Sequence, residues 1–120
     1  MVEDDDGLRS AIERFLSAAG FSTVAYTSAE AMFAGGEIER AACVVSDIKL
    51  PAMSGLDLLD TVRAHDGWPP VIVITAHDSK AMRDEAQRHG AAGYLAKPFQ
   101  GGALLAAIDG ATAPARPSAT

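Results

Sequence analysis

Four groups of charged or reactive side chains follow short apolar segments of this chain. They are the acidic run Glu3-Asp4-Asp5-Asp6, the aspartate Asp47, the pair Thr75-Ala76 and the pair Lys97-Pro98. The segment before Asp47 contains adjacent valines, which is typical of a buried strand, and Pro51, Ser54 and Gly55 then interrupt regular structure. Asp47 is therefore predicted at the carboxyl end of a strand, where open α/β sheets place their ligand sites.

Parallel strands would bring all four groups to one edge of a sheet. The carboxylates of Glu3, Asp4 and Asp47 would then repel one another unless a cation neutralised them. Oxygen ligands of this kind suit Mg²⁺, which often binds together with phosphate. Lys97 would pair with Asp47 and with incoming phosphoryl oxygens, and Thr75 would supply a hydroxyl donor. The combination predicts a phosphoryl-accepting site with Asp47 as the nucleophile.

Each of these motifs has an ordinary structural explanation when it is taken alone. An acidic run near the N-terminus commonly caps a helix, and a strand-end threonine commonly makes a local hydrogen bond. A Lys-Pro pair is a common turn, and Tyr94 alone would be an aromatic residue at the edge of the core. The functional interpretation depends on their order and on their shared position after successive strands.

Composition limits the classes of protein to consider. The 120 residues fit one domain, and 48% hydrophobic and 22% charged residues are ordinary for a soluble globular protein. A net charge of -6 argues against direct binding to nucleic acid, which requires a basic face. No apolar run is long enough for a membrane span, and no segment resembles a signal peptide, so a cytoplasmic location is predicted. The single Cys43 is expected to be a small buried residue.

Candidate strands and helices alternate along the chain, which is typical of βαβ units and a parallel sheet. Strands are predicted at 21–26, 42–46, 71–75 and 93–96, and helices around 8–19, 28–35, 56–62 and 79–89. A last helix is predicted to carry Leu104, Leu105 and Ile108. The second helix is expected to begin at Thr27 or Ser28, with Glu30 completing a capping box from Thr27. The last helix is expected to be weak because of its glycines. We predict one domain over residues 1–110 and a flexible tail or linker over residues 111–120.

These motifs together resemble the receiver domain of two-component response regulators, most closely the receivers of helix-turn-helix transcription regulators. The resemblance covers nearly the whole chain. It rests on Glu3-Asp4, on the segment Ser46-Asp47-Ile48-Lys49-Leu50-Pro51-Ala52-Met53-Ser54-Gly55, on Thr75-Ala76 and on Gly93-Tyr94-Leu95-Ala96-Lys97-Pro98-Phe99. It implies a flavodoxin-like, doubly wound parallel sheet of five strands in the order 2-1-3-4-5.

The resemblance also implies a role for each matching residue. Asp47 would accept a phosphoryl group from a sensor histidine kinase or a phosphotransfer protein. Mg²⁺ would be held by Asp4, by Asp47 and by the backbone carbonyl of Lys49, with Glu3 acting mainly through water. Lys97 would support phosphoryl transfer, and the Lys97–Pro98 bond would be cis.

In such a receiver, Thr75 and Tyr94 would form the switch. The Thr75 hydroxyl would move toward the phosphorylated Asp47, and Tyr94 would fill the vacated space, which changes a partner-binding surface. Lys49 and His77 stand at the positions that flank the attacking water in this family. They would either slow hydrolysis by holding phosphoryl oxygens or remain as solvated side chains.

Three functions from different classes compete. The first is a signalling receiver that catalyses only its own phosphoryl transfer and dephosphorylation. The second is a receiver-like interaction module that works without phosphate, although the complete set of site residues argues against it. The third is a small phosphatase or phosphotransferase, but such enzymes usually carry a second aspartate where this chain has Lys49. An output domain or a downstream protein as partner, and a homodimer, remain open.

The N-terminus is short for a receiver. Only Met1 and Val2 precede Glu3, whereas a typical strand has about 5–6 residues. The first strand, which lies at the centre of the expected sheet, is therefore predicted to be truncated. We expect either marginal stability or a sheet completed by a strand from another copy.

Overall fold

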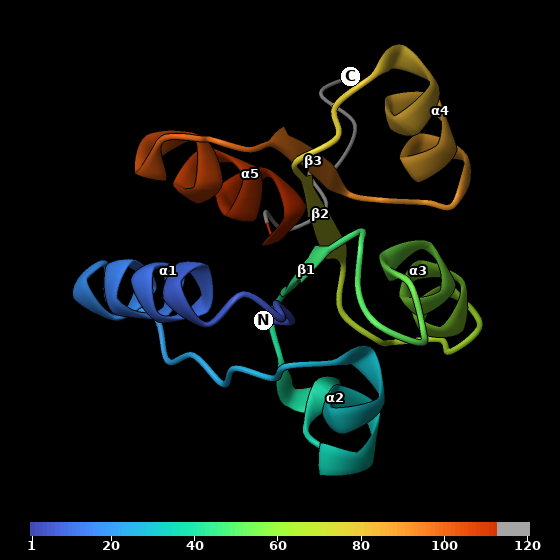
Figure 1. Ribbon diagram of the computed structural model, residues 1–120. Helices are drawn as coiled ribbons and strands as arrows, with labels where there is room; N and C mark the ends of the chain where they lie inside the picture. The colour runs from blue at the N-terminus through green and yellow to red at the C-terminus, as the bar shows by residue number, and fades with distance from the viewer. Residues whose placement is uncertain (113–120) are drawn as a thin grey trace, which may run out of the picture.

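The fold is a parallel sheet covered by helices on both faces (Figure 1). It is described by a computed structural model over residues 1–112. The strands are β1 (Val44–Asp47), β2 (Val71–Thr75) and β3 (Gly93–Ala96). The helices are α1 (Asp6–Ala18), α2 (Ala29–Gly35), the short 3-10 helix η1 (Ile38–Arg40), α3 (Gly55–Arg63), α4 (Lys80–Arg88) and α5 (Gly101–Thr112).

The strands alternate their side chains between two hydrophobic layers. Val71 and Val73 of β2 pack with the layer formed by α2, α3 and α4, and Ile72 and Ile74 pack with the layer formed by α1 and α5. Figure 1 shows the same division, with α1 and α5 on one side of the sheet and α2, α3 and α4 on the other. Because β2 is covered on both faces, all five of its residues are buried, which accounts for its continuous apolar sequence.

The sheet follows the predicted strand order, with a truncated first strand. The three strands pair in the order β1-β2-β3, and Val2 forms isolated parallel bridges to Tyr26 on one side and to Ser46 on the other. The N-terminal residues therefore lie between the segment ending at Tyr26 and β1. This is the place of the first strand in the order 2-1-3-4-5.

The segment 21–26 was predicted as a strand, and this prediction is wrong for all but its last residue. Only Tyr26 pairs: its N–H donates to Met1 O at 2.8 Å, and its carbonyl accepts from Glu3 N at 3.0 Å. A strand needs a neighbour along its length, and Met1–Glu3 is too short to supply one. Strand β1 also differs slightly, since it begins at Val44 and includes Asp47 as its last residue.

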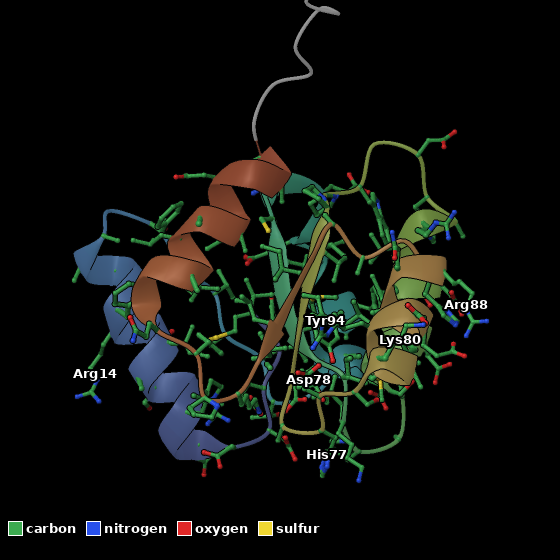
Figure 2. All side chains as sticks on the ribbon, turned by 90° about the horizontal axis from the view of Figure 1, so that it is seen from above. Arg14, His77, Asp78, Lys80, Arg88 and Tyr94 are labelled. Atoms are coloured by element: carbon green, nitrogen blue, oxygen red, sulfur yellow. The ribbon has the colours of Figure 1, made fainter. Side chains whose placement is uncertain are left out.

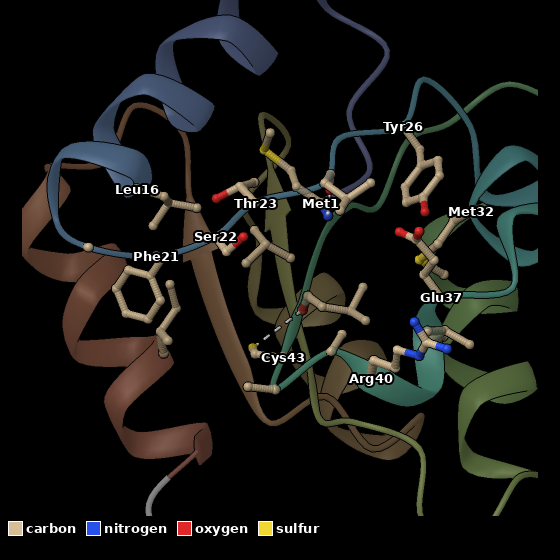
Figure 3. Close-up of a pocket in the computed structure, with 18 residues that line it drawn as sticks. Met1, Leu16, Phe21, Ser22, Thr23, Tyr26, Met32, Glu37, Arg40 and Cys43 are labelled. Atoms are coloured by element: carbon tan, nitrogen blue, oxygen red, sulfur yellow. Dashed lines mark hydrogen bonds between the residues drawn. The ribbon is translucent and has the colours of Figure 1, made fainter.

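A cavity of about 560 Å³ lies beside Met1 (Figure 3). Its walls come from the irregular segment 20–24 and from residues 40–45 before and within β1. Val24 on one wall is 50% exposed. The Met1 ammonium donates to Val24 O at 2.9 Å, and its burial lowers the pKa of this group to about 6.

Helix boundaries follow local capping residues. Asp5, Ser28, Ser54 and Ser79 cap α1, α2, α3 and α4, and each side chain accepts a backbone N–H from the first turn. The capping box predicted from Thr27 to Glu30 is not formed, because Ser28 is the cap and Glu30 accepts from Met53 N instead.

The last helix is longer than predicted. Despite three glycines, α5 runs through Thr112, because Leu104 and Ile108 are buried against the sheet. Ala111 and Thr112 are therefore helical, although the tail was predicted to start at Ala111. The rest of that predicted tail lies outside the described residues. Within residues 1–112, no helix is both long enough and apolar enough to cross a membrane.

Candidate functional site: an acidic pocket at the carboxyl edge of the sheet

Three carboxylates meet where the strands end, as the sequence predicted. Oxygen atoms of Glu3, Asp4 and Asp47 lie within 4.8 Å of one another. Glu3 is fully buried and Asp47 is 6% exposed, whereas Asp4 is exposed to solvent. Burial raises the pKa of the Glu3 carboxyl, and the hydrogen bond from Lys97 opposes this effect. The pocket is therefore a place where negative charge accumulates partly away from water.

Lys97 joins the two buried carboxylates. Its Nζ donates to Glu3 Oε1 and to Asp47 Oδ2, each at 2.8 Å. Burial lowers the pKa of the Lys97 ammonium, but the hydrogen bonds to Asp47 and Glu3 outweigh it, and the net shift is upward. The chain places Lys97 immediately after β3, and the Lys97–Pro98 peptide bond is cis, as predicted.

The donor set fits a divalent cation. Three carboxylates face one ammonium, so the pocket carries two negative charges in excess. Carboxylate oxygens are the ligands that Mg²⁺ prefers, and Mg²⁺ commonly keeps several waters where a site is open on one side. The exposed Asp4 provides that open side.

The loop after Asp47 orients its carboxylate. The backbone N–H of Lys49 donates to Asp47 Oδ1 at 3.0 Å, so each carboxylate oxygen has one donor. The Lys49 side chain itself is exposed. Gly55 N donates to Ile48 O at 2.7 Å and closes the loop. A Cβ at Gly55 would lie 2.6 Å from Ile48 Cα, so this close approach requires glycine.

Thr75 is the last residue of β2 and is buried at the same edge. Its Oγ1 accepts a hydrogen bond from His77 N at 2.9 Å. This bond uses a lone pair and leaves the hydroxyl proton available for another acceptor. His77 therefore contacts Thr75 through its backbone, which the sequence did not suggest.

Tyr94 lies on β3 beside Val73, and its side chain is half-buried. Its hydroxyl donates to Asp78 Oδ1 at 3.0 Å (Figure 2). Burial, followed by this hydrogen bond to a carboxylate, raises the pKa of the Tyr94 phenol. In this arrangement Tyr94 points to the loop between β2 and α4.

Two residues at the edge of the site were not found by sequence reasoning. Asp78 receives the Tyr94 hydroxyl, and Arg9 donates to the Glu3 backbone carbonyl at 3.1 Å and pairs with Asp6. The contacts of Asp78 with Tyr94 and of Arg9 with the Glu3 carbonyl depend on how separate segments come together in three dimensions, and the sequence has no local signal for them. The Asp6–Arg9 pair, in contrast, has the i,i+3 spacing of a local helix pair.

Comparison with known proteins identifies the family. A model of the response regulator receiver domain matches residues 1–109. The chain belongs to the response-regulator receiver family. The match covers every residue of the acidic pocket, and it agrees with the resemblance predicted from the motifs.

Relatives of this receiver include transcription regulators. The chain is 35% identical over 108 residues to the transcriptional regulatory protein FixJ of Azorhizobium caulinodans. The aligned region covers 90% of this chain and 51% of FixJ. It is 41% identical over 105 residues to the response regulator protein FleR of Pseudomonas aeruginosa, covering 88% of this chain and 22% of FleR. The receiver thus spans about half or less of these relatives.

Solved structures show the same fold. A crystal structure of FixJ-N superposes with a TM-score of 0.82 at 32% identity, covering 92% of this chain and 89% of that one. The receiver domain of the response regulator NarL from Mycobacterium tuberculosis gives a TM-score of 0.83 at 26% identity, covering 94% of each chain. The flavodoxin-like architecture predicted from the motifs is confirmed. Receivers of this family are phosphorylation-dependent signalling modules rather than conventional enzymes.

Proposed function

We propose that Asp47 is the phosphoacceptor of this receiver and that its donor is the phosphohistidine of a sensor histidine kinase or of a phosphotransfer protein. The observation that carries the proposal is the placement of Asp47 between the Lys97 ammonium and the Lys49 N–H, at 2.8 and 3.0 Å. These donors hold the carboxylate in one orientation at the open edge of the sheet. Positioning of this kind is a large part of catalysis of phosphoryl transfer.

The proposed reaction is a direct transfer. An oxygen of the Asp47 carboxylate forms a bond to phosphorus while the phosphorus–nitrogen bond of phosphohistidine breaks. The electron pair of that bond returns to the imidazole nitrogen, which takes up a proton. Lys97 remains beside the acceptor and compensates negative charge on the phosphoryl oxygens. Hydrolysis later returns Asp47 to its carboxylate form, and this is the only other reaction that we assign to the chain.

Mg²⁺ is the cofactor that we assign to the acidic pocket. Asp4, Asp47 and the backbone carbonyl of Lys49 would hold it, with Glu3 contributing through water. Bound Mg²⁺ would neutralise carboxylates that otherwise repel an incoming phosphoryl group. Lys97 alone leaves two negative charges uncompensated, which is the reason for expecting a metal requirement.

We further propose that phosphorylation changes a surface that includes Tyr94. The Thr75 hydroxyl has a proton free for a phosphoryl oxygen, and Tyr94 lies on the adjacent strand. The partner would be an output domain or a separate downstream protein, because relatives such as FixJ are transcriptional regulatory proteins. We assign the receiver to the cytoplasm because relatives such as FixJ are transcriptional regulatory proteins. We do not assign nucleic-acid binding to these 120 residues, whose net charge is -6.

Phosphorylation of the whole chain by acetyl phosphate tests this proposal. Intact-mass spectrometry should show one added phosphoryl group in the presence of Mg²⁺ and none in EDTA. Asp47→Asn should remove the label, and Asp66→Asn, which changes an exposed carboxylate in the turn after α3, should retain it. Unlabelled parent protein would favour an interaction module that works without phosphate. Repeated turnover of an added phosphoester would favour a phosphatase.

A further inference from the structure

The loop between β2 and α4 contacts both residues assigned to the switch. His77 N donates to Thr75 Oγ1 at 2.9 Å, and the next residue, Asp78, accepts from the Tyr94 hydroxyl at 3.0 Å. Figure 2 shows His77, Asp78 and Tyr94 together at this end of the sheet. Two adjacent residues of one loop therefore connect a side chain on β2 with a side chain on β3.

Arg83 fixes the carboxylate that Tyr94 contacts. Its Nε donates to Asp78 Oδ1 at 3.0 Å, and its Nη2 donates to Asp78 Oδ2 at 3.1 Å. A two-pronged contact of this kind restricts a carboxylate more than a single bond does. The hydrogen bond from Arg83, followed by that from Tyr94, lowers the pKa of the Asp78 carboxyl. Asp78 is thus charged near neutral pH and is a strong acceptor for the Tyr94 hydroxyl.

This arrangement differs from the Lys80–Asp84 pair on the same helix. Lys80 and Asp84 are 3.8 Å apart and largely exposed, with 93% and 55% of their side chains accessible. An isolated pair of this type has little structural effect. Asp78, by contrast, joins α4 to β3 through a half-buried tyrosine.

A movement of Thr75 would affect both ends of the loop. If the Thr75 side chain turns toward Asp47, either the bond from His77 N breaks or the loop follows the hydroxyl. The first outcome removes a hydrogen bond that holds the backbone next to Asp78, and the second displaces that backbone. The hydrogen bond from the Tyr94 hydroxyl to Asp78 Oδ1 then loses its favourable geometry, and the Tyr94 ring becomes free to leave its present position.

We propose that Asp78, held by Arg83, is the positioning residue that couples Thr75 to Tyr94. It retains Tyr94 at the loop while Asp47 is unphosphorylated and releases it when Thr75 moves. The release of Tyr94 deepens the proposed function and rests on it, because it requires phosphorylation of Asp47. The retention of Tyr94 concerns the unphosphorylated chain alone.

NMR of the full chain with ¹³C-labelled tyrosine tests retention without any phosphoryl group. In Asp78→Asn the pKa of the Tyr94 phenol should fall toward its ordinary value, because the adjacent carboxylate is removed. Arg83 and the Ser79 backbone, the other groups facing the phenol, are unchanged in this variant. Asp84→Asn on the same helix is the matched control and should leave Tyr94 unchanged. Tyr26, whose pKa is raised by burial and by Glu37, serves as an internal reference.

The same spectra test release. Beryllofluoride with Mg²⁺ mimics the phosphoryl group, and the Tyr94 ring signals of the parent should shift when it is added. In Asp78→Asn without beryllofluoride, the Tyr94 signals should already move part of the way toward those of the parent with beryllofluoride. The population of the released form should rise about two- to fivefold, because contacts between exposed charges usually contribute a factor of this size. Thr75→Ala should abolish the beryllofluoride response at Tyr94.

Two results would overturn the inference. One is an Asp78→Asn variant in which the Tyr94 signals and phenol pKa equal those of the parent. The other is an equal effect of Asp84→Asn, which would indicate a general charge effect of α4. Intact-mass labelling of the parent at Asp47 separates a failure of this inference from a failure of the proposed function. Loss of labelling in the parent contradicts the proposed function, whereas unchanged Tyr94 signals contradict the role of Asp78.

Discussion

A single ammonium group balances two buried carboxylates in this receiver. Lys97 contacts Glu3 and Asp47 at equal distances of 2.8 Å, and Glu3 has no exposure to solvent. Removing one partner from a buried ionic contact leaves the other charge uncompensated, which is costly. Lys97 therefore has two roles: it stabilises the pocket, and it places positive charge where a phosphoryl group would arrive.

Lys97→Met should separate phosphorylation from metal binding. We expect the rate of labelling by acetyl phosphate to fall by about 10²-fold, the usual effect of removing one preorganised donor. Mg²⁺ affinity, measured by calorimetry, should be retained or increased because a competing cation is lost. Lys49→Met is the control, since its side chain is exposed and only its backbone N–H contacts Asp47. A Lys97→Met variant with a parental labelling rate would contradict the assigned role.

The contacts of His89 lead us to expect that the stability of the fold depends on pH. Its Nδ1 lies 2.6 Å from Asp60 on α3, and its Nε2 lies 3.3 Å from Glu85 on α4. The contact with Asp60, and to a smaller extent that with Glu85, raises the pKa of His89 above its ordinary value of 6.5. Because the folded pKa is raised, the stabilisation is complete below pH 6.5 and is lost as pH rises through the folded value.

Thermal melts of the parent and of His89→Gln check this expectation. The difference in melting temperature should be largest near pH 6 and should decrease toward alkaline pH. His65 provides the control, because its Nδ1 contacts the Thr61 carbonyl rather than a carboxylate. A difference that is constant with pH would show that His89 acts only through packing.

At the scale of elements, the N-terminus of α3 positions the loop of the phosphoacceptor. Ser54 and Asp57 form a reciprocal capping box, and Gly55 approaches the backbone of Asp47 and Ile48. The start of this helix and the end of β1 are therefore packed backbone to backbone. A change at Gly55 must move one of them.

Gly55→Ala should destabilise the chain and disturb Asp47. Overpacking of this kind costs about 1–3 kcal/mol, measured by denaturant unfolding. The labelling rate should fall as well, because the loop that orients Asp47 is displaced. Gly102→Ala in α5 is the matched control: a Cβ there meets nothing within 4 Å, and alanine favours helix by up to about 1 kcal/mol. Equal stability of the two variants would contradict the packing argument.

Elements with strong local patterns were predicted well from the sequence. Strand β2 has the predicted bounds, because five consecutive apolar or β-branched residues are buried on both faces. The segment 21–26 has a similar composition, but a strand also needs a partner, and Met1–Glu3 is too short. Likewise, α5 extends past the predicted tail boundary because burial of Ile108 outweighs the glycines. Asp47, Thr75 and Lys97 could be placed at one edge of the sheet from the sequence because each lies at, or directly after, the carboxyl end of a strand. The contacts of Asp78 with Tyr94 and of Arg9 with the Glu3 carbonyl have no such local pattern.

At the scale of the whole molecule, Met1–Glu3 lies between two neighbouring segments of the sheet. It is paired on both sides, since Asp47 N donates to Val2 O at 3.0 Å on the side of β1 and Glu3 N donates to Tyr26 O at 3.0 Å on the other side. Beyond Met1 the two neighbouring segments are separated by the cavity of about 560 Å³. The cavity reduces packing around the strand that positions Glu3 and Asp4. Stability and metal binding are therefore expected to be coupled.

An N-terminal extension should strengthen both properties. Five residues of alternating valine and isoleucine before Met1 would supply a strand for the cavity. We expect a rise in melting temperature of several degrees, since about 1 kcal/mol corresponds to roughly 4 °C in a domain of this size. Mg²⁺ binding should tighten too. A five-residue Gly-Ser extension is the control, and equal behaviour of the two extensions would show that the cavity does not limit stability.

Locating the modified residue tests directly whether Asp47 receives the phosphoryl group. Borohydride reduces an aspartyl phosphate to homoserine, which peptide mass spectrometry can place in the sequence. After treatment with acetyl phosphate and Mg²⁺, we expect homoserine at position 47 and unmodified Asp4, Asp5 and Asp57. Homoserine at another position, or none in a chain that carries the added phosphoryl mass, would contradict it.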